Sequence, residues 1–275
     1  MKLNAALDVA KSPFLNRRPR EAWRWLQSDI FLSLAAFVIL VGLWEIVSLN
    51  MEPILFASPE RTVTAFIAMV QDGTLLTAWR QDLVLLFTAL VIAAVTGVAM
   101  AIILGRFRVV DQLLEPIVNG VFMTPKIALL PIIALWLGFQ LPAKIVVVWM
   151  FGFFDVFFIV RSGLRAIDAD YVQVARAYCL PERALFRYIM VPASLPYIVT
   201  GLRLGLLHGM VGLVLAGFFL ESNGIGGLIS NADSNYDMAS VFAILLTVAV
   251  FAAGINSGLR LAQSRIAPWS QREPA

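Results

Sequence analysis

The sequence predicts an all-α polytopic membrane protein with about six transmembrane helices and one large polar loop. Of its 275 residues 60% are hydrophobic and only 14% are charged, whereas soluble globular proteins carry about 25% charged residues. The mean hydropathy is +0.84, and the apolar residues form blocks of about 20, enough to cross the hydrocarbon core as helices. These blocks are apolar on every face, so they predict helices and not the alternating strands of a barrel.

Six spans are predicted in order along the chain. Three are continuous apolar blocks, at 30–49, 83–104 and 238–259. Three are interrupted by proline or by polar residues, at 117–139, 145–160 and 204–220. The third span, 117–139, is the least regular, because it contains Pro125, Lys126 and Pro131.

Proline removes a backbone donor and bends a helix, and in lipid the freed carbonyl needs a neighbouring helix or a water-filled cavity. Pro131 therefore has two interpretations. It belongs either to a kinked packing helix or to a discontinuous helix that lines a translocation path.

Polar residues inside the fourth and fifth spans raise a similar question. An ionised residue in lipid costs at least ~2.5–3.5 kcal/mol, so Asp155 should face a cavity or a partner. Arg161 lies six residues further on and points elsewhere on the helix. Asp155 therefore either contacts a cationic or hydrogen-bonding solute or pairs with a polar group on a neighbouring helix. His208 either lines the path with Met210 or satisfies a backbone carbonyl.

The fifth span also contains glycines four residues apart, at Gly201, Gly205 and Gly209. Such spacing forms a groove in which another helix can approach closely. The groove serves either packing within the subunit or an interface between two copies of the chain.

The distribution of Lys and Arg predicts that both termini lie in the cytoplasm. The segments that would then be inside, 1–29, 105–126, 161–203 and 260–275, hold 18 of the 21 Lys and Arg residues. Cytoplasmic segments of membrane proteins carry such an excess of positive charge. The net charge of +3 is therefore explained by the membrane, and nucleic acid is not needed as a partner.

A single membrane domain, 30–259, is expected between a lead-in at 1–29 and a tail at 260–275. Trp23 and Trp25 flank Arg24 in the lead-in, which suits an anchor at the lipid interface or a docking site for a partner. After the first span, Ser58 and Pro59 predict the start of a short amphipathic helix on the external side.

Several function classes are excluded by residue types. A single cysteine, Cys179, rules out an intrachain disulfide, and a single histidine leaves too few ligands for a zinc site. The sequence has no G-x-x-x-x-G-K-[ST] motif to bind ATP phosphates and no nucleophile with a nearby base. It therefore predicts neither an enzyme nor a metal or cofactor site.

The most distinctive segment is the polar loop 166–196 between the fourth and fifth spans. Its first part, 171–178, predicts a short helix with acidic residues at its N-terminus. Pro181 ends that helix and starts a second one, 182–190. Pro192 then redirects the chain into the fifth span.

The spacing in this loop resembles the cytoplasmic loop of permease subunits of bacterial ATP-binding-cassette (ABC) importers. That loop reads Glu-Ala-Ala, three residues, Gly, nine residues, then Ile-x-Leu-Pro. In this chain these positions fall on Gln173, Val174, Ala175, Cys179, Ile189, Val191 and Pro192. Resemblance to the nitrate, sulfonate and taurine branch begins at 56–60, continues through 106–108, 130–139 and 163–165, and ends near 266–269. It covers about three quarters of the chain.

The resemblance implies a permease subunit in the bacterial inner membrane, importing a small solute of the nitrate, sulfonate, taurine or vitamin-precursor class. Its implied partners are two copies of a cytoplasmic ABC ATPase, a second permease copy, a periplasmic solute-binding protein and the lipid. The binding protein would dock on 50–80 and on 221–237, which contains Glu221, Asp233 and Asp237.

The ATPase would dock on the coupling helix in the polar loop, where small Ala175 and Ala177 would let the helix fit a groove of the partner. The implied coupling residues are Gln173, Val174, Ala175, Arg176, Ala177, Tyr178, Cys179, Ile189 and Pro192. The candidates for the translocation path are Pro131, Asp155, His208 and Met210.

Several positions depart from the family pattern, and two of them bear most on coupling. Gln173 replaces a glutamate, so a salt bridge to the ATPase is lost while a hydrogen bond is kept. Cys179 replaces a glycine, and would carry strain of about 1 kcal/mol or more if its backbone needed positive φ. The simpler interpretation is that Leu180 and Pro181 end the helix instead.

The alternative function is a secondary transporter or channel that works alone. Such proteins use ion-coupling carboxylates near the middle of the membrane and commonly contain an internal repeat. The sequence offers one such Asp and no repeat.

Overall fold

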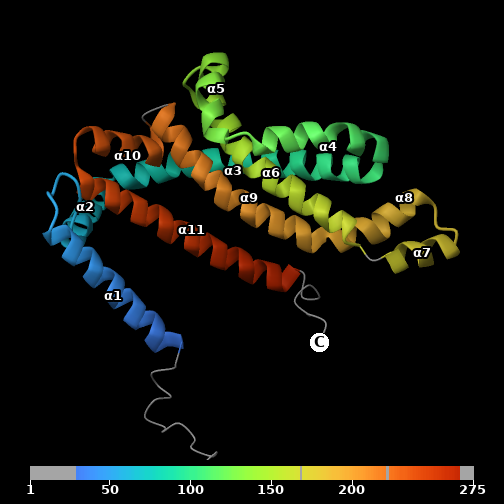
Figure 1. Ribbon diagram of the computed structural model, residues 1–275, viewed down its shortest axis with the longest axis horizontal. Coiled ribbons are helices and arrows are strands. Elements are labelled where there is room, and N and C mark those ends of the chain that lie inside the picture. Colours follow the sequence, from blue (N-terminus) through green and yellow to red (C-terminus); the bar gives the residue numbers. More distant parts are fainter. Residues whose placement is uncertain (1–28, 168, 221–222, 267–275) are drawn as a thin grey trace, which may run out of the picture. The chain divides into compact units, whose positions relative to one another are not determined.

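The computed structural model describes residues 29–167, 169–220 and 223–266, and every regular element in these residues is helical (Figure 1). The predicted anchor at Trp23–Trp25, the residue Glu221 and the end of the tail lie outside the described residues. Five helices are long and apolar enough to cross a membrane, and a sixth span is formed if one bent helix pair is counted. The predicted all-α membrane protein is therefore confirmed.

The chain divides into two compact units, 1–60 and 61–275. The described part of the first unit is mainly α1 (Asp29–Leu49), which corresponds to the first predicted span. After it the chain folds back, because the Trp44 indole donates a hydrogen bond to the Ala57 carbonyl over 2.8 Å. The next helix, α2 (Pro59–Gln71), begins at the predicted Pro59.

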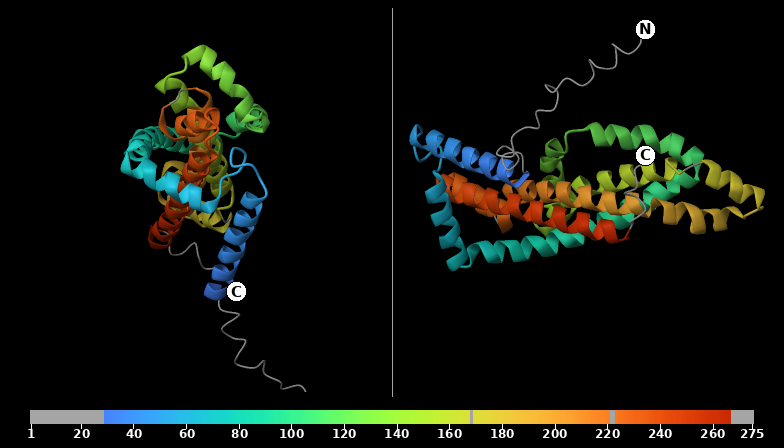
Figure 2. Two further views of the ribbon diagram at one scale, coloured as in Figure 1. Left: turned by 90° about the vertical axis from the view of Figure 1, so that its left-hand side faces the viewer. Right: turned by 90° about the horizontal axis from the view of Figure 1, so that it is seen from below.

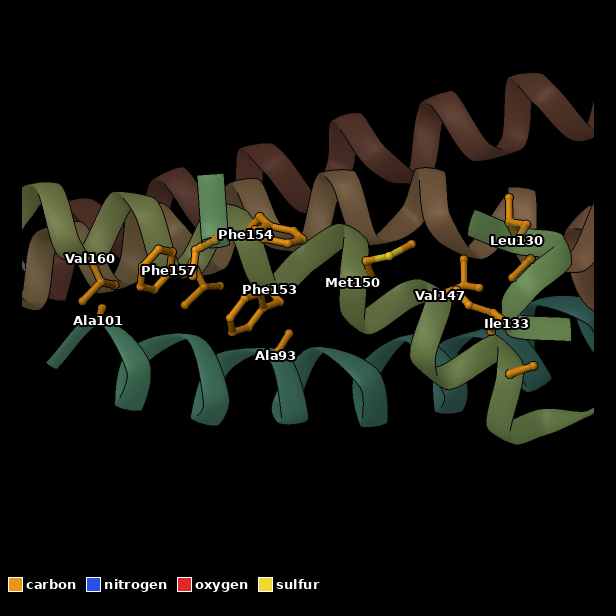
Figure 3. Close-up of a cluster of buried hydrophobic side chains, with 14 of the residues drawn as sticks. Ala93, Ala101, Leu130, Ile133, Val147, Met150, Phe153, Phe154, Phe157 and Val160 are labelled. Atoms are coloured by element: carbon orange, nitrogen blue, oxygen red, sulfur yellow. The ribbon is translucent and has the colours of Figure 1, made fainter. Parts of the chain in front are cut away.

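Three long helices form the centre of the second unit: α3 (Thr74–Arg106), α6 (Leu141–Arg165) and α9 (Val191–Phe219). They lie side by side, with α6 packed against both others (Figures 1 and 2). On α3, small Ala93 lies beside the Phe153 ring of α6, and small Ala101 lies beside Val160 (Figure 3). This pairing of small with large side chains fills the core without leaving gaps.

Glycine brings α6 and α9 into backbone contact. A Cβ atom on Gly205 would lie 2.9 Å from the Gly152 carbonyl oxygen, and one on Gly201 would lie 3.2 Å from the Val156 Cα. Small residues at helix crossings allow this close approach in membrane proteins. The glycine groove of the fifth span therefore serves packing within the subunit.

The third predicted span is broken. It consists of α4 (Arg108–Met123), the 3₁₀ turn η3 (Lys126–Leu129) and α5 (Leu130–Leu137), and its two arms are bent by 90°. Pro131 lies in the first turn of α5, where the missing N–H costs no helix hydrogen bond. Lys126 lies at the bend. The connection between α3 and α4 is the single extended residue Phe107, so it is much shorter than the predicted segment 105–126.

One end of the second unit carries α10 (Gly224–Ser234), which packs against α3, α9 and α11 (Met238–Ile266). The buried Asp82 carboxylate accepts a hydrogen bond from the Ile225 N–H over 2.7 Å and so caps α10. Buried Lys144 donates to the Asn223 carbonyl over 3.0 Å. At the same end, hydrogen bonds from Thr74 lower the pKa of Asp72 below its ordinary value.

The opposite end carries α7 (Ala169–Ala177), α8 (Glu182–Leu185) and the π-helical turn η4 (Phe186–Met190). Figure 1 and the right-hand view of Figure 2 show α7 and α8 extending beyond the long helices. The expected change of direction at Pro192 is absent. Instead α8, η4 and α9 form one helical segment of 38 residues, Glu182–Phe219. Pro192 lies in the first turn of α9, and the wide π turn before it accommodates the missing N–H.

Candidate functional site

The short helix predicted at 171–178 is present, and α7 covers most of that range. Its exposed face carries Tyr171, Val174 and Tyr178, which are three and four residues apart and therefore lie in one row along the helix. Val174 is 56% exposed. The helix thus presents an aromatic and aliphatic stripe to its surroundings, which we call the α7 stripe.

The two small residues expected on the docking face differ in exposure. Ala175 is only 5% exposed, so it offers little surface to a partner. Ala177 is exposed. The sequence pattern placed the small residues correctly on the helix, but it could not tell which face the chain itself covers.

The other motif residues are spread over three elements. Gln173 is exposed on α7, Ile189 is half-buried in η4, and Pro192 is exposed at the start of α9. Arg176 lies on α7, and its side chain is outside the description. The motif therefore spans the whole connection from the coupling helix into the fifth span.

Cys179 adopts the left-handed backbone conformation, with φ +52°. The Leu180 N–H donates to the Ala175 carbonyl over 3.0 Å, which is the hydrogen bond of a Schellman motif at the end of α7. The expectation that Leu180 and Pro181 end the helix in place of a left-handed residue is wrong. Cys179 occupies the conformation that glycine favours.

A network of ion pairs joins α4 to the α7 end of α6. The Arg161 guanidinium contacts Asp111 at 2.6 Å and Glu115 at 2.9 Å, and Arg165 contacts Asp111 at 2.6 Å. The Arg161 side chain is 6% exposed, whereas that of Arg165 is 53% exposed. The network was not predicted from the sequence. A signal was present, since Asp111 and Glu115 are four residues apart, as are Arg161 and Arg165, and residues at this spacing share one helix face.

A further ion pair joins Arg106, at the end of α3, to Glu182, at the start of α8. The second half of the polar loop is thereby attached to α3 as well as to α9. Movement of the loop would therefore act on several long helices together.

Two of the path candidates meet between α6 and α9. The His208 Nδ1 atom and the Asp155 Oδ2 atom are 2.7 Å apart, a hydrogen-bond distance. The His208 side chain is 56% exposed and that of Asp155 is 17% exposed. Asp155 thus has a partner on a neighbouring helix, and the pair still faces outward from the subunit.

Lys126 lies at the bend of the third span beside a cavity of about 400 Å³, lined also by Phe122, Phe151 and Leu215. Its ammonium lies 5.1 Å from the ring centroid of Phe122, 5.3 Å from Phe154 and 5.4 Å from Phe151. Sequence reasoning noted Lys126 only as an interruption of the span. Its role at the bend depends on the three-dimensional position of rings from α4 and α6.

The other two path candidates do not join this pair. Met210 is 3% exposed and packs in an apolar cluster with Leu86, Val148 and Leu213, so it contributes to the core. Pro131 is exposed in the first turn of α5, after the bend. Only Asp155 and His208 of the four are in mutual contact.

Residues 93–269 match the family of binding-protein-dependent transport system inner membrane components. This chain belongs to that family. It is 26% identical over 258 residues to the taurine transport system permease protein TauC of Escherichia coli (strain K12), with 91% of this chain and 94% of TauC covered. It is also 26% identical to the putative aliphatic sulfonates transport permease protein SsuC of Bacillus subtilis (strain 168), with 98% of each chain covered.

The fold is similar to that of a solved chain in an inward-facing conformation of the MetNI methionine ABC transporter. The TM-score is 0.63 at 18% identity, over 71% of this chain and 97% of the solved chain. The permease is thus a multi-pass membrane subunit of an ABC importer. Its family works with ATPase subunits and a solute-binding protein, and ATP hydrolysis belongs to the separate subunits.

Proposed function

We propose that this permease imports a small sulfonate-like or related polar solute and is driven by an ATPase that docks on the α7 stripe. The relatives TauC and SsuC are named for taurine and aliphatic sulfonates, and nitrate and vitamin precursors belong to the same expected class. Two permease copies, two ATPases and an external solute-binding protein complete the proposed transporter, with both termini of the permease in the cytoplasm.

The exposed α7 stripe is the observation that carries this proposal. Apolar and aromatic side chains that no part of the described chain covers mark an interaction site. The helix extends beyond the membrane-spanning helices, as Figure 1 shows, and aromatic residues are enriched at the centres of protein interfaces. An ATPase that binds this stripe can transmit its own movement to the membrane-spanning helices.

The ion pairs around the loop support transmission of that movement. Arg106 holds α8 to α3, and the buried Arg161 holds α6 to α4. The unbroken helix from Glu182 to Phe219 connects the loop directly to α9. A displacement of α7 would therefore reach the elements that carry Asp155 and His208.

The opposite end suits the solute-binding protein. Of the proposed docking segment 221–237, the first half of α10 is buried, and the exposed side chains follow it. These include Asn231, Asp233, Tyr236 and Asp237. We propose that this polar, acidic surface receives the binding protein.

Val174→Arg tests the docking proposal. Val174 points away from the chain, so the substitution should leave the permease folded while a long charged side chain blocks a close-packed ATPase surface. Co-purification of the ATPase should fall at least tenfold, or by about 1.4 kcal/mol or more. Ala166→Arg adds the same side chain to the exposed start of the same loop and should leave assembly unchanged.

Gln173→Glu restores the charge of the family pattern and should preserve both assembly and solute uptake. If Val174→Arg assembled and transported like the parent, the loop would be a simple connector and the proposal would fail. Ala175→Arg is not a test of docking, since it would disturb the inner face of α7.

A further inference from the structure

Three ionisable side chains come from three separate elements of the permease: Lys126 on η3, at the break of the bent helix pair, Asp155 on α6 and His208 on α9. Ionisable residues within membrane-spanning helices, such as Asp155 and His208, commonly mark substrate or ion pathways. We call these residues the polar cluster.

Asp155 and His208 lie on the faces of α6 and α9 that also contribute to the cavity beside Lys126. Phe151 and Leu215 line the 400 Å³ cavity beside Lys126. Asp155 follows Phe151 by four residues, and His208 precedes Leu215 by seven, so each lies on the same helix face as its cavity residue. At 1.5 Å per residue, Asp155 is displaced from Phe151 by about 6 Å along the helix axis.

The cation of the polar cluster is available to a ligand. Within the described residues, the Lys126 ammonium forms no ion pair within 4.0 Å, and it lies near the rings of Phe122, Phe151 and Phe154. Lys126 and Asp155 interact electrostatically, but without direct contact. An anionic group could bind at Lys126 without displacing a protein carboxylate.

Within the described part of the chain, the carboxylate of the polar cluster is hydrogen-bonded at only one of its two oxygens. Asp155 Oδ2 is hydrogen-bonded to His208, and Oδ1 forms no hydrogen bond to any other described residue. The imidazole fixes the orientation of the carboxylate and leaves one oxygen to accept a bond from a ligand. A cationic or N–H group would be attracted there.

We propose that the polar cluster is the solute-contact site of the path and selects small zwitterions, which carry an anionic and a cationic group at opposite ends. This inference rests on the proposed import function. The anionic group contacts Lys126, and the cationic group contacts Asp155. A solute with only an anionic group would be attracted by Lys126 but repelled by Asp155. A solute with only a cationic group would be attracted by Asp155 but repelled by Lys126. Repulsive elements of this kind set specificity as much as attractive ones.

The single histidine of the chain provides a direct test. The full-length permease, labelled with ¹³C-histidine and placed in lipid nanodiscs, gives one imidazole signal, from His208. We would titrate it with three matched probes: taurine, which has an amine and a sulfonate, ethanesulfonate, which lacks the amine, and ethylamine, which lacks the sulfonate. Taurine should shift the signal with an affinity about tenfold or more above that of either other probe, since it makes both charge-assisted contacts.

Two variants assign the contacts. Lys126→Met should reduce taurine affinity to that of ethylamine, and Asp155→Asn should reduce it to that of ethanesulfonate. Arg80→Met removes an exposed cation elsewhere on α3 and should leave the titration unchanged. Helix content and elution volume establish that each variant is folded.

Equal affinity for taurine and ethanesulfonate would overturn the proposal in favour of a simple anion site. An unchanged His208 signal with all three probes at 100-fold molar excess would also overturn it, because the cluster would then not contact solute. The titration needs no ATPase, so it can fail while the Val174→Arg experiment succeeds, and the reverse also holds.

Discussion

Cys179 ends α7 at φ +52°, where the Cβ of an L-residue crowds the following backbone. Cys179→Gly should relieve this strain, partly offset by the greater flexibility of glycine in the unfolded chain, for a net gain of about 1 kcal/mol. Hydrogen exchange of the Leu180 amide, which bonds to Ala175, should slow several-fold. Cys179→Ala removes the thiol but keeps the Cβ, so it should show no slowing. Equal exchange in both variants would mean that the conformation is not strained.

Gly205 lies where α6 and α9 touch. In Gly205→Ala the new Cβ would lie 2.9 Å from the Gly152 oxygen and 3.0 Å from Val156, so the helices must separate, at a cost of about 1–3 kcal/mol. We expect a lower thermal midpoint in detergent. Gly254→Ala, on α11, has open space around its Cβ and should be neutral or slightly stabilising. A Gly205→Ala midpoint equal to that of the parent would contradict the observed close contact.

Residue types could be predicted from the sequence, but their neighbours could not. Asp155 and His208 stood out because polar side chains are costly in lipid, yet they are 53 residues apart and nothing in the sequence joins them. The burial of Met210 and of Ala175 could not be predicted for the same reason. Helical periodicity says which residues share a face, whereas packing decides which face the protein covers.

At the scale of the elements, ion pairs join α4 to α6, and the two arginines that form them differ in exposure. Arg161→Gln should lower the free energy of unfolding more than the change of its exposed neighbour, because it removes the buried cation from Asp111 and Glu115 and leaves them only Arg165. Arg165→Gln removes the same charge one turn away, at a 53% exposed position. It should cost about 1 kcal/mol or less.

The fraction of each variant that stays soluble after heating in detergent would measure the difference. The same loss from both variants would show that the burial of Arg161 does not matter to stability. Arg161→Lys keeps the charge but not the two-pronged geometry of the guanidinium, so its stability should lie between that of the parent and that of Arg161→Gln.

Elements were predicted well where hydropathy alone defines them, as for α1, α3 and α11. The prolines were harder to interpret. Pro125 and Pro131 accompany a 90° break, whereas Pro192 and Pro196 lie within a continuous helix. The sequence does not separate these outcomes, because the π turn η4 and neighbouring contacts decide whether a missing N–H breaks the helix.

At the scale of the whole molecule, the fold could be predicted from composition and the family from one loop motif. The distribution of Lys and Arg predicts an orientation in the membrane, and the single cysteine provides a test of it. Cys179 is exposed beside the α7 stripe. In spheroplasts, a membrane-permeant maleimide should label it and an impermeant one should not, because the predicted orientation puts the loop on the cytoplasmic side.

The matched control moves the thiol to the other end of the permease. Asn235 is exposed in the turn between α10 and α11, so Asn235→Cys in a Cys179→Ser background should react with the impermeant maleimide. Labelling of Cys179 from outside would reverse the orientation and remove the basis for ATPase docking. In isolated membranes, co-expression of the ATPase should slow labelling of Cys179 about tenfold or more, because docking at the adjacent Tyr178 would bury the thiol. In Val174→Arg we expect the ATPase no longer to slow the labelling of Cys179. If labelling were still slowed in that variant, the ATPase would dock elsewhere.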